Sequence, residues 1–258
     1  MTLSLDYDSA ASLASLWDEL VMGRCKIVET FSTPEHCSLR LNRASPGPLS
    51  ERQGALTRRQ IDALELYLIG SSQKCVAIDF GLAGSSVAAM LQQCFRFMGL
   101  SCIPSRAPLM LVLAAHASAA CRSRRSTPLK PWWPPSGEWV ARVSRPDAVL
   151  ESLLPPAEYA VIALLAEGKS YDEMARLRQT SVRTIANQVG AAFRRLRVSG
   201  RAQLLCLVAR RTVESLQEAH ERDTGMLAGR LANDALEPCQ KQAIVPRVQR
   251  GIEVAIRQ

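Results

Sequence analysis

Apolar residues recur at three- and four-residue steps in two long segments of the chain, a spacing that predicts amphipathic helices. In each segment the first periodic stretch ends at a glycine, Gly70 or Gly168. A serine two residues later, Ser72 or Ser170, can cap a second, short helix. A third helix follows a tight turn, and a fourth begins after an arginine. Each segment therefore predicts four helices, and we expect a mainly α fold.

The two segments are copies of one another. Laying the sequence against itself with a shift of 98 residues superposes Leu66, Gly70, Ser72, Ala77, Val87, Phe95 and Met98 on Leu164, Gly168, Ser170, Ala175, Ile185, Phe193 and Leu196. The small Ala77 and Ala175 would let the second and third helices cross closely, as a helix-turn-helix pair requires. The sequence thus predicts two tandem four-helix helix-turn-helix modules. A plain all-α scaffold of short helices is the alternative.

The second copy resembles the LuxR-type (GerE-like) helix-turn-helix domain over roughly 60 of the 258 residues. The stretches that fit are Leu154-Pro155 with Glu158, Ala166 to Ser170, Glu173-Met174-Ala175, Ser181 to Ile185, Phe193 to Leu196, and Arg201 to Leu204. The resemblance implies a bacterial transcription regulator that binds double-stranded DNA. It also implies a homodimer, with RNA polymerase as a further candidate partner.

The third helix of the second copy has the residue pattern of a helix that reads the major groove. Its outward positions share one face at three- and four-residue steps, while Ile185, Val189 and Phe193 point to the core. Asparagine and glutamine can make bidentate contacts to adenine, and arginine and threonine can bind phosphates or base edges. The expected DNA-binding residues are Ser170, Ser181, Arg183, Thr184, Asn187, Gln188, Arg194, Arg195 and Arg201.

Within this set, Arg183, Asn187 and Gln188 are expected in the groove. Ser181 can cap the helix, and the other members are expected to contact phosphate or to orient the module. The alternative is that the arginines merely form a solvated surface.

The second copy departs from the family pattern at its turn and in its third helix. Where the family has a Leu-Gly-Ile type of turn, this copy has Arg178-Gln179-Thr180, so we expect a looser turn. Ala186 and Gln188 replace a frequent lysine and histidine, which puts the family's usual target sequence in doubt.

The first copy departs in the opposite way. Its turn, Phe80-Gly81-Leu82, suits the fold, but its third helix has no basic residue before Arg96. Phosphate neutralisation supplies most non-specific affinity, so this helix should bind DNA poorly. We interpret the copy as a degenerate module for dimerisation, intramolecular packing or weak auxiliary contacts through Ser85, Ser86 and Gln92. The alternative is that both copies bind DNA, the first through Arg58, Arg59 and Lys74.

Composition agrees with a folded, mainly helical chain. It is 47% hydrophobic and only 5% aromatic, which favours short helices over large sheets. The net charge of +8 favours a polyanionic partner only modestly. The eight cysteines form no C-x-x-C pair and have only three scattered histidines, so reduced core thiols are expected, with no metal, no cofactor and no catalytic residues. An enzyme is therefore not expected.

The ends of the chain and the region between the copies add smaller elements. We expect a helix over residues 9–22, a hairpin of Cys25 to Phe31 with Cys37 to Asn42, and a strand at Glu138 to Val143, so that each module has its own β attachment. Trp17 is expected to pack near the hairpin. The basic, proline-rich stretch from Arg122 to Gly137 predicts an exposed linker. Trp132 or Trp133 is expected to clamp it onto a domain; the alternative is that its charge contacts phosphate and a tryptophan stacks on a base.

These elements predict five parts. Residues 1–50 form an N-terminal helix and hairpin, 51–120 the degenerate module, 121–145 the linker and strand, 146–223 the LuxR-type domain, and 224–258 a helical tail of one or two further short helices. An N-terminus without a basic, apolar signal and the lack of 18 consecutive apolar residues predict a cytoplasmic protein without membrane contact.

Two functions follow from the pattern. The first is a DNA-binding transcription regulator that acts as a dimer, and the alternative is a protein-interaction adaptor or anti-regulator built on degenerate helix-turn-helix folds. The segment before each copy is too short for the sensory or receiver domains often joined to LuxR-type modules. The sequence therefore gives no support for a small-molecule or phosphorylation input.

Overall fold

A computed structural model describes residues 3–33, 35–43, 55–101, 107–123, 137–144 and 146–236. The chain divides into two compact units, Met1–Glu218 and Ala219–Gln258. The described residues are mainly helical and form one small four-stranded sheet, so the prediction of a mainly α fold is confirmed.

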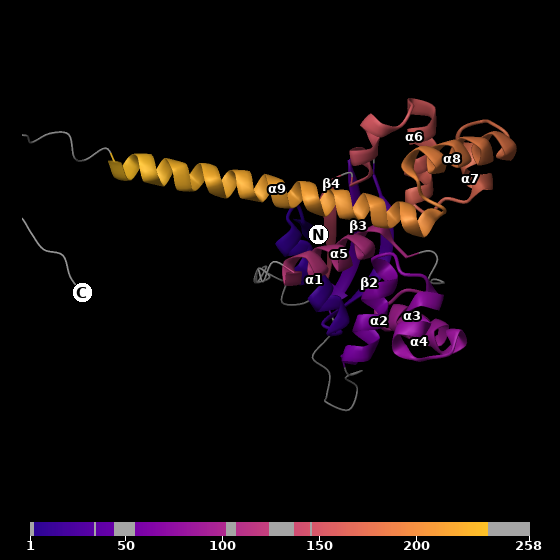
Figure 1. The fold of residues 1–258 in the computed structure, drawn as a ribbon, viewed down its shortest axis with the longest axis horizontal. Helices are drawn as coiled ribbons and strands as arrows, with labels where there is room; N and C mark the ends of the chain where they lie inside the picture. Colours follow the sequence, from indigo (N-terminus) through magenta and orange to yellow (C-terminus); the bar gives the residue numbers. More distant parts are fainter. Residues whose placement is uncertain are drawn as a thin grey trace, which may run out of the picture. The chain divides into compact units, whose positions relative to one another are not determined.

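Helices occur where the periodicity predicts them (Figure 1). The first copy forms α2 Arg58–Leu68, α3 Gln73–Phe80, α4 Gly84–Phe97 and α5 Leu109–Ser123. The second copy forms α6 Pro156–Ala166, α7 Tyr171–Leu177, α8 Val182–Leu196 and α9 Arg201–Leu236, after a 3-10 helix, η2, at Pro146–Leu153. Ser72 and Ser170 cap α3 and α7 as expected, each accepting a hydrogen bond from a backbone N–H three residues on.

The turn between the second and third helices has the same backbone in both copies. Gly81 and Gln179, 98 positions apart, are both left-handed, with φ of 61° and 51°. Equivalent hydrogen bonds close the turn. The Leu82 N–H donates to the Ala77 carbonyl at 2.9 Å, and the Thr180 N–H donates to the Ala175 carbonyl at 3.0 Å. The expectation of a looser turn in the second copy is therefore wrong, because Gln179 adopts the glycine conformation and keeps the bond.

The sheet joins segments that lie far apart in the sequence. Its strands are β1 Leu3–Asp6, β2 Cys25–Ser32, β3 His36–Arg43 and β4 Glu138–Ser144, in the order β1-β4-β3-β2, with β1 parallel to β4 and the other pairs antiparallel. The hairpin and the strand before the second copy thus belong to one sheet, which corrects the expectation of a separate β attachment for each module. The pairing of β3 with β4 is a long-range contact, and no local sequence pattern encodes it.

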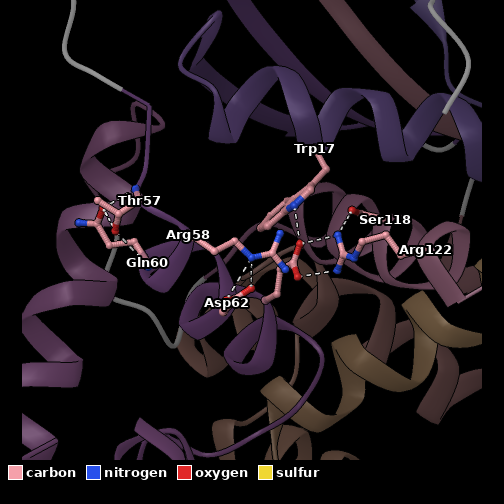
Figure 2. A network of polar contacts seen from close by, with 8 residues as sticks. Trp17, Thr57, Arg58, Gln60, Asp62, Ser118 and Arg122 are labelled. Carbon is pink, nitrogen blue, oxygen red and sulfur yellow. Dashed lines mark hydrogen bonds and ion pairs between the residues drawn. The ribbon is translucent and has the colours of Figure 1, made fainter. Parts of the chain in front are cut away.

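Helices α1 (Ala10–Val21) and α5 form the centre of the core and pack closely against each other (Figure 1). Trp17 is 1% exposed, and its indole N–H donates to Oε1 of Glu65 in α2 at 2.8 Å. Arg122 of α5 forms an ion pair with the same carboxylate at 2.6 Å and donates to the Ser118 hydroxyl at 2.7 Å. Figure 2 shows Trp17, Ser118 and Arg122 converging on this network, which ties three helices together.

These contacts also correct the start of the predicted linker. Arg122 and Ser123 are the last residues of α5, and Arg122 is paired with the Glu65 carboxylate. Residues 124–136, with Trp132 and Trp133, lie outside the described residues.

Helix α9 is longer than the pattern predicts. It runs without a break from Arg201 to Leu236, so separate short helices do not begin at residue 224. The sequence has no proline between these two residues, and the glycines within the stretch do not end the helix. Residues 237–258 of the predicted tail lie outside the described residues.

Cysteine placement agrees only in part with the expectation of core thiols. Cys25, Cys94 and Cys121 are buried, whereas Cys75 is exposed. Cys75 lies in the first turn of α3, where its sulfur accepts a hydrogen bond from the Ser72 hydroxyl at 3.2 Å. Among the described helices, no single one is long and apolar enough to cross a membrane, and α3 with α4 reaches that length only as a pair bent by 106°.

Candidate nucleic-acid interface

The third helix of the second copy, α8, starts from a well-formed cap. Ser181 has an extended backbone, and its Oγ accepts a hydrogen bond from the Thr184 N–H at 3.0 Å. The two hydroxyl groups of these residues lie 2.9 Å apart. Both side chains are exposed, so the cap fixes the start of α8 at the surface of the molecule.

One face of α8 is exposed and the other is packed, as the periodicity predicts. Ile185 and Val189 are buried, and Phe193 packs against the core. The exposed face carries Arg183, Thr184, Asn187 and Arg194. The helix contains three arginines and no acidic residue. This face can therefore donate hydrogen bonds and approach a polyanion without charge repulsion.

Gln188 differs from its neighbour Asn187. It is half-buried, and its Oε1 is buried without a hydrogen-bond partner, whereas Asn187 is exposed. A buried amide oxygen without a partner costs about 1 to 3 kcal/mol, so this side chain gains from any new donor that reaches it.

Two of the expected phosphate-binding arginines are engaged within the module. Arg195 binds both carboxylate oxygens of Glu158 in α6, at 3.1 and 3.3 Å, and so joins α6 to α8. Arg201 donates to the carbonyls of Leu165 and Ala166 at 2.9 and 3.2 Å. It therefore caps the negative C-terminal end of α6. Both arginines orient the helices around α8.

Ser170 is likewise committed to a local role. Its hydroxyl accepts the Glu173 N–H at 3.3 Å and donates to the Glu173 carboxylate at 2.8 Å, forming a capping box at the start of α7. The bonds from the Ser170 backbone and hydroxyl lower the pKa of Glu173. A carboxylate thus already occupies this helix end, which makes Ser170 a less favourable phosphate contact than the exposed residues of α8.

The two copies differ sharply in charge. Residues 169–201 contain eight lysines and arginines and two acidic residues, whereas the equivalent residues 71–103 contain two basic residues and one acidic residue. In the first copy, Ser85, Ser86, Gln92 and Arg96 are exposed on α4. The basic side chain is therefore confined to the far end of that helix.

The other basic residues of the first copy are partly engaged. Arg58 pairs with Asp62 at 3.0 Å, and Arg59 donates to the Phe80 carbonyl at 3.0 Å and lies over its ring. Lys74 is exposed.

Sequence reasoning missed an apolar rim beside α8. Leu177 is 62% exposed and Val182 is 43% exposed, and both flank the turn between α7 and α8. A shallow hollow at this turn is lined by Asp172, Arg176, Gln179 and Thr180, among others. The departure of the turn from the family pattern was the only signal that this edge is unusual. The described residues contain no group of three or more His, Cys, Asp or Glu side chains able to hold a metal ion.

Comparison of the chain with family models, with curated proteins and with solved structures gives no match. The LuxR-type resemblance therefore rests on the residues of the second copy themselves.

Proposed function

We propose that the protein is a DNA-binding transcription regulator. In this proposal α6 to α9 form a LuxR-type helix-turn-helix module, and α2 to α5 form a degenerate copy of it. The observation that carries the proposal is the exposed face of α8, which combines arginine, threonine and asparagine side chains with no acidic residue.

The side chains of this face match the chemistry of the major groove. Asn187 can pair with the N6 and N7 positions of adenine, and Arg183 with the O6 and N7 positions of guanine. Arg194 lies about two helical turns beyond Asn187 and suits a phosphate contact. Replacing Arg183 with alanine should weaken specific binding by about 1 to 3 kcal/mol.

The fixed surroundings of α8 support a reading role. Arg195 and Arg201 hold α6 against α8 and α9, and buried Ile185 and Val189 anchor α8 from below. A helix that is held rigidly can present its side chains to bases in one register. One helix contacts too few base pairs for genomic specificity, so the regulator is expected to act as a homodimer on a partly symmetric site.

Two arginines at equivalent positions of the two copies give a matched test. Arg194 of α8 and Arg96 of α4 are 98 positions apart, and both are exposed. The affinity of the full chain for a pool of random duplexes would be measured by fluorescence anisotropy across salt concentrations, for the wild type, Arg194→Ala and Arg96→Ala.

Arg194→Ala should lower affinity several-fold and reduce the salt slope by about one, because one phosphate contact is lost. Arg96→Ala should leave both nearly unchanged. Equal losses in the two variants would mean that both copies bind DNA, and no salt-sensitive binding by the wild type would remove the proposal.

A protein-interaction adaptor remains the second candidate function, favoured by the exposed apolar side chains. Ile78 of α3 is 69% exposed and Leu177 of α7 is 62% exposed. Apolar side chains at such positions suit a protein contact. Salt separates the two functions, since added salt weakens phosphate binding and strengthens apolar association.

A further inference from the structure

The turn between α3 and α4 of the first copy carries an exposed surface, which we name the α3–α4 face. Its residues are Ile78 and Asp79 at the end of α3 and Ala83, Gly84, Ser85 and Ala89 at the start of α4, all of them exposed. Ile78 is 69% exposed, more than any other large hydrophobic side chain among the described residues. An apolar side chain that stands so far out of the protein suits a contact with another surface.

The two sides of this turn form one continuous surface. In the second copy, Arg176 and Val182 line one hollow at the turn between α7 and α8. The first-copy turn has the same left-handed residue position and is closed by an equivalent hydrogen bond. The residues 98 positions earlier, Ile78 and Gly84, therefore lie together as well. A Cβ at Gly84 would meet no atom within 4 Å, so another chain can approach the backbone closely there.

The α3–α4 face lacks the groups that suit its counterpart to a polyanion. The second copy has Arg176, Arg183 and Asn187 at the positions where the first copy has Ile78, Ser85 and Ala89. Two cations and an amide are thus replaced by small or apolar side chains. Two chains that each carry a net charge of +8 can bring such faces together without repulsion between cations, whereas the basic faces of α8 would repel one another.

The same face also carries both halves of a polar contact. The cap residue of α4 is Ala83, so no side chain caps the first N–H groups of α4, whereas Ser181 caps α8. Asp79, four residues before Ala83, is exposed. Arg59 already binds the carboxyl end of α3, where it donates to the Phe80 carbonyl at 3.0 Å. A carboxylate suits a helix N-terminus, so one face can supply the acceptor that the α4 end of an identical face needs.

We propose that the α3–α4 face is a dimer interface and that it binds the same face of a second copy of this chain. The Ile78 side chains of the two chains meet at the twofold axis, and Asp79 of each chain accepts hydrogen bonds from the first turn of the other α4. A twofold interface requires one patch that complements itself, and this face combines an apolar side chain, open backbone, a donor end and a carboxylate. The inference that this dimer serves DNA reading rests on the proposed function, whereas dimerisation itself does not.

The test is sedimentation velocity of the full chain over a range of concentrations, without DNA, for the wild type, Ile78→Asp and Leu177→Asp. The wild type should form a dimer. Ile78→Asp should raise the dissociation constant at least about tenfold, because two carboxylates would then face each other away from water. Leu177, an apolar residue of the second copy, is 62% exposed, so Leu177→Asp is the matched control and should dimerise as the wild type does. Both positions are exposed, so both variants should fold.

A mixture of Ile78→Asp with Ile78→Lys tests whether the face meets itself. Each variant alone should stay monomeric at concentrations where the wild type dimerises, because like charges meet at the axis. The mixture should form a dimer of the two chains, because opposite charges then meet. A monomeric wild type, an Ile78→Asp variant that dimerises as well as the wild type, an equal loss in Leu177→Asp, or a mixture that stays monomeric would overturn the proposal.

The outcome is independent of the DNA-binding proposal. A wild type that dimerises through this face but shows no salt-sensitive DNA binding supports the dimer and removes the proposed function. A wild type that reads DNA but stays monomeric without DNA at every concentration overturns the dimer and leaves the reading face of α8 in place.

Discussion

Single residues in the left-handed region show how the same backbone is reached from different sequences. Gly81 and Gln179 occupy equivalent positions with φ of 61° and 51°, and Gly99 and Arg197 do so with φ of 91° and 56°. Glycine adopts this region freely, whereas a side chain adds a steric cost of roughly 1 to 2 kcal/mol. The second copy therefore carries backbone strain at two positions where the first copy has none.

The turn residues give an exchange experiment. Gln179→Gly should raise the free energy of unfolding by about 0.5 to 1 kcal/mol, and Gly81→Gln should lower it by about 1 kcal/mol. A Cβ at Gly81 meets no atom within 4 Å, so backbone strain alone sets the cost. Urea denaturation of both variants measures the two changes. A destabilised Gln179→Gly would show that the glutamine side chain makes a contact worth more than the strain.

The contacts of Gly99 could not be predicted from its local sequence. A Cβ at this glycine would lie 2.3 Å from the carbonyl oxygen of Ile27 in β2. The Ile27 N–H also donates to the Met98 carbonyl at 2.8 Å. The repeat aligns Gly99 with Arg197, but only the structure shows that one copy meets a strand at this point. Such contacts join distant segments, and no local pattern records them.

At the scale of elements, the carboxylate of Glu65 holds three helices together. Its oxygens accept from the Trp17 indole of α1 and from the Arg122 guanidinium of α5. The side chain of Glu65 is only 9% exposed, so removing it would leave the buried indole N–H of Trp17 without an acceptor, whereas the 47% exposed Arg122 could turn to water.

Glu65→Ala should therefore lower the free energy of unfolding by about 1 to 3 kcal/mol, chiefly because the Trp17 indole loses its acceptor. Asp62 lies in the same helix and pairs with Arg58 at the surface, where the two side chains are 37% and 75% exposed. Asp62→Ala should cost less than about 0.5 kcal/mol and serves as the matched control. Equal losses of stability in Glu65→Ala and Asp62→Ala, measured by thermal or urea unfolding, would contradict the claim that the Glu65 carboxylate holds the three helices together.

The packing around α5 also predicts a dependence of stability on pH. Burial lowers the pKa of His116 to about 4, and the nearby Arg210 charge adds to the effect. An unfolded histidine binds its proton below about pH 6.5, so between pH 6.5 and 4 the unfolded state binds more protons than the folded state. The contribution to stability is therefore present above pH 6.5 and is lost as the pH falls to 4.

His116→Gln measures this contribution. The stability of the wild type relative to the variant should fall by about 2 to 3 kcal/mol between pH 7 and pH 4. Urea unfolding across this pH range gives the stability of the wild type and of the variant. The difference between the two curves cancels the titration of the carboxylates that both proteins share. A constant difference between the curves would show that His116 does not titrate in this window.

Element positions were largely predictable, and their partners were not. Periodicity, the serines at helix starts and the glycines at helix ends are local signals, and they located α2 to α4 and α6 to α8. The exposed and packed faces of α8 followed from the same spacing. The single sheet, strand β1 and the capping role of Arg201 depend on contacts across the chain.

The molecule as a whole is asymmetric in charge between two copies of one helical pattern. The stretch around α7 and α8 has eight basic residues, and its counterpart around α3 and α4 has two. This difference is expected if the second copy binds DNA and the first does not, since phosphate attraction scales with the number of cations at the interface. The central claim is that the face of α8 reads a DNA sequence.

The most direct measurement of that claim is selection of duplexes from a random pool by the full chain, repeated with Asn187→Ala. The account predicts enrichment of a partly symmetric sequence by the wild type, and loss of preference at one base position per half-site in the variant, with about 1 to 3 kcal/mol of discrimination removed. Enrichment of the same sequence to the same degree by Asn187→Ala, or no enrichment by the wild type, would contradict it.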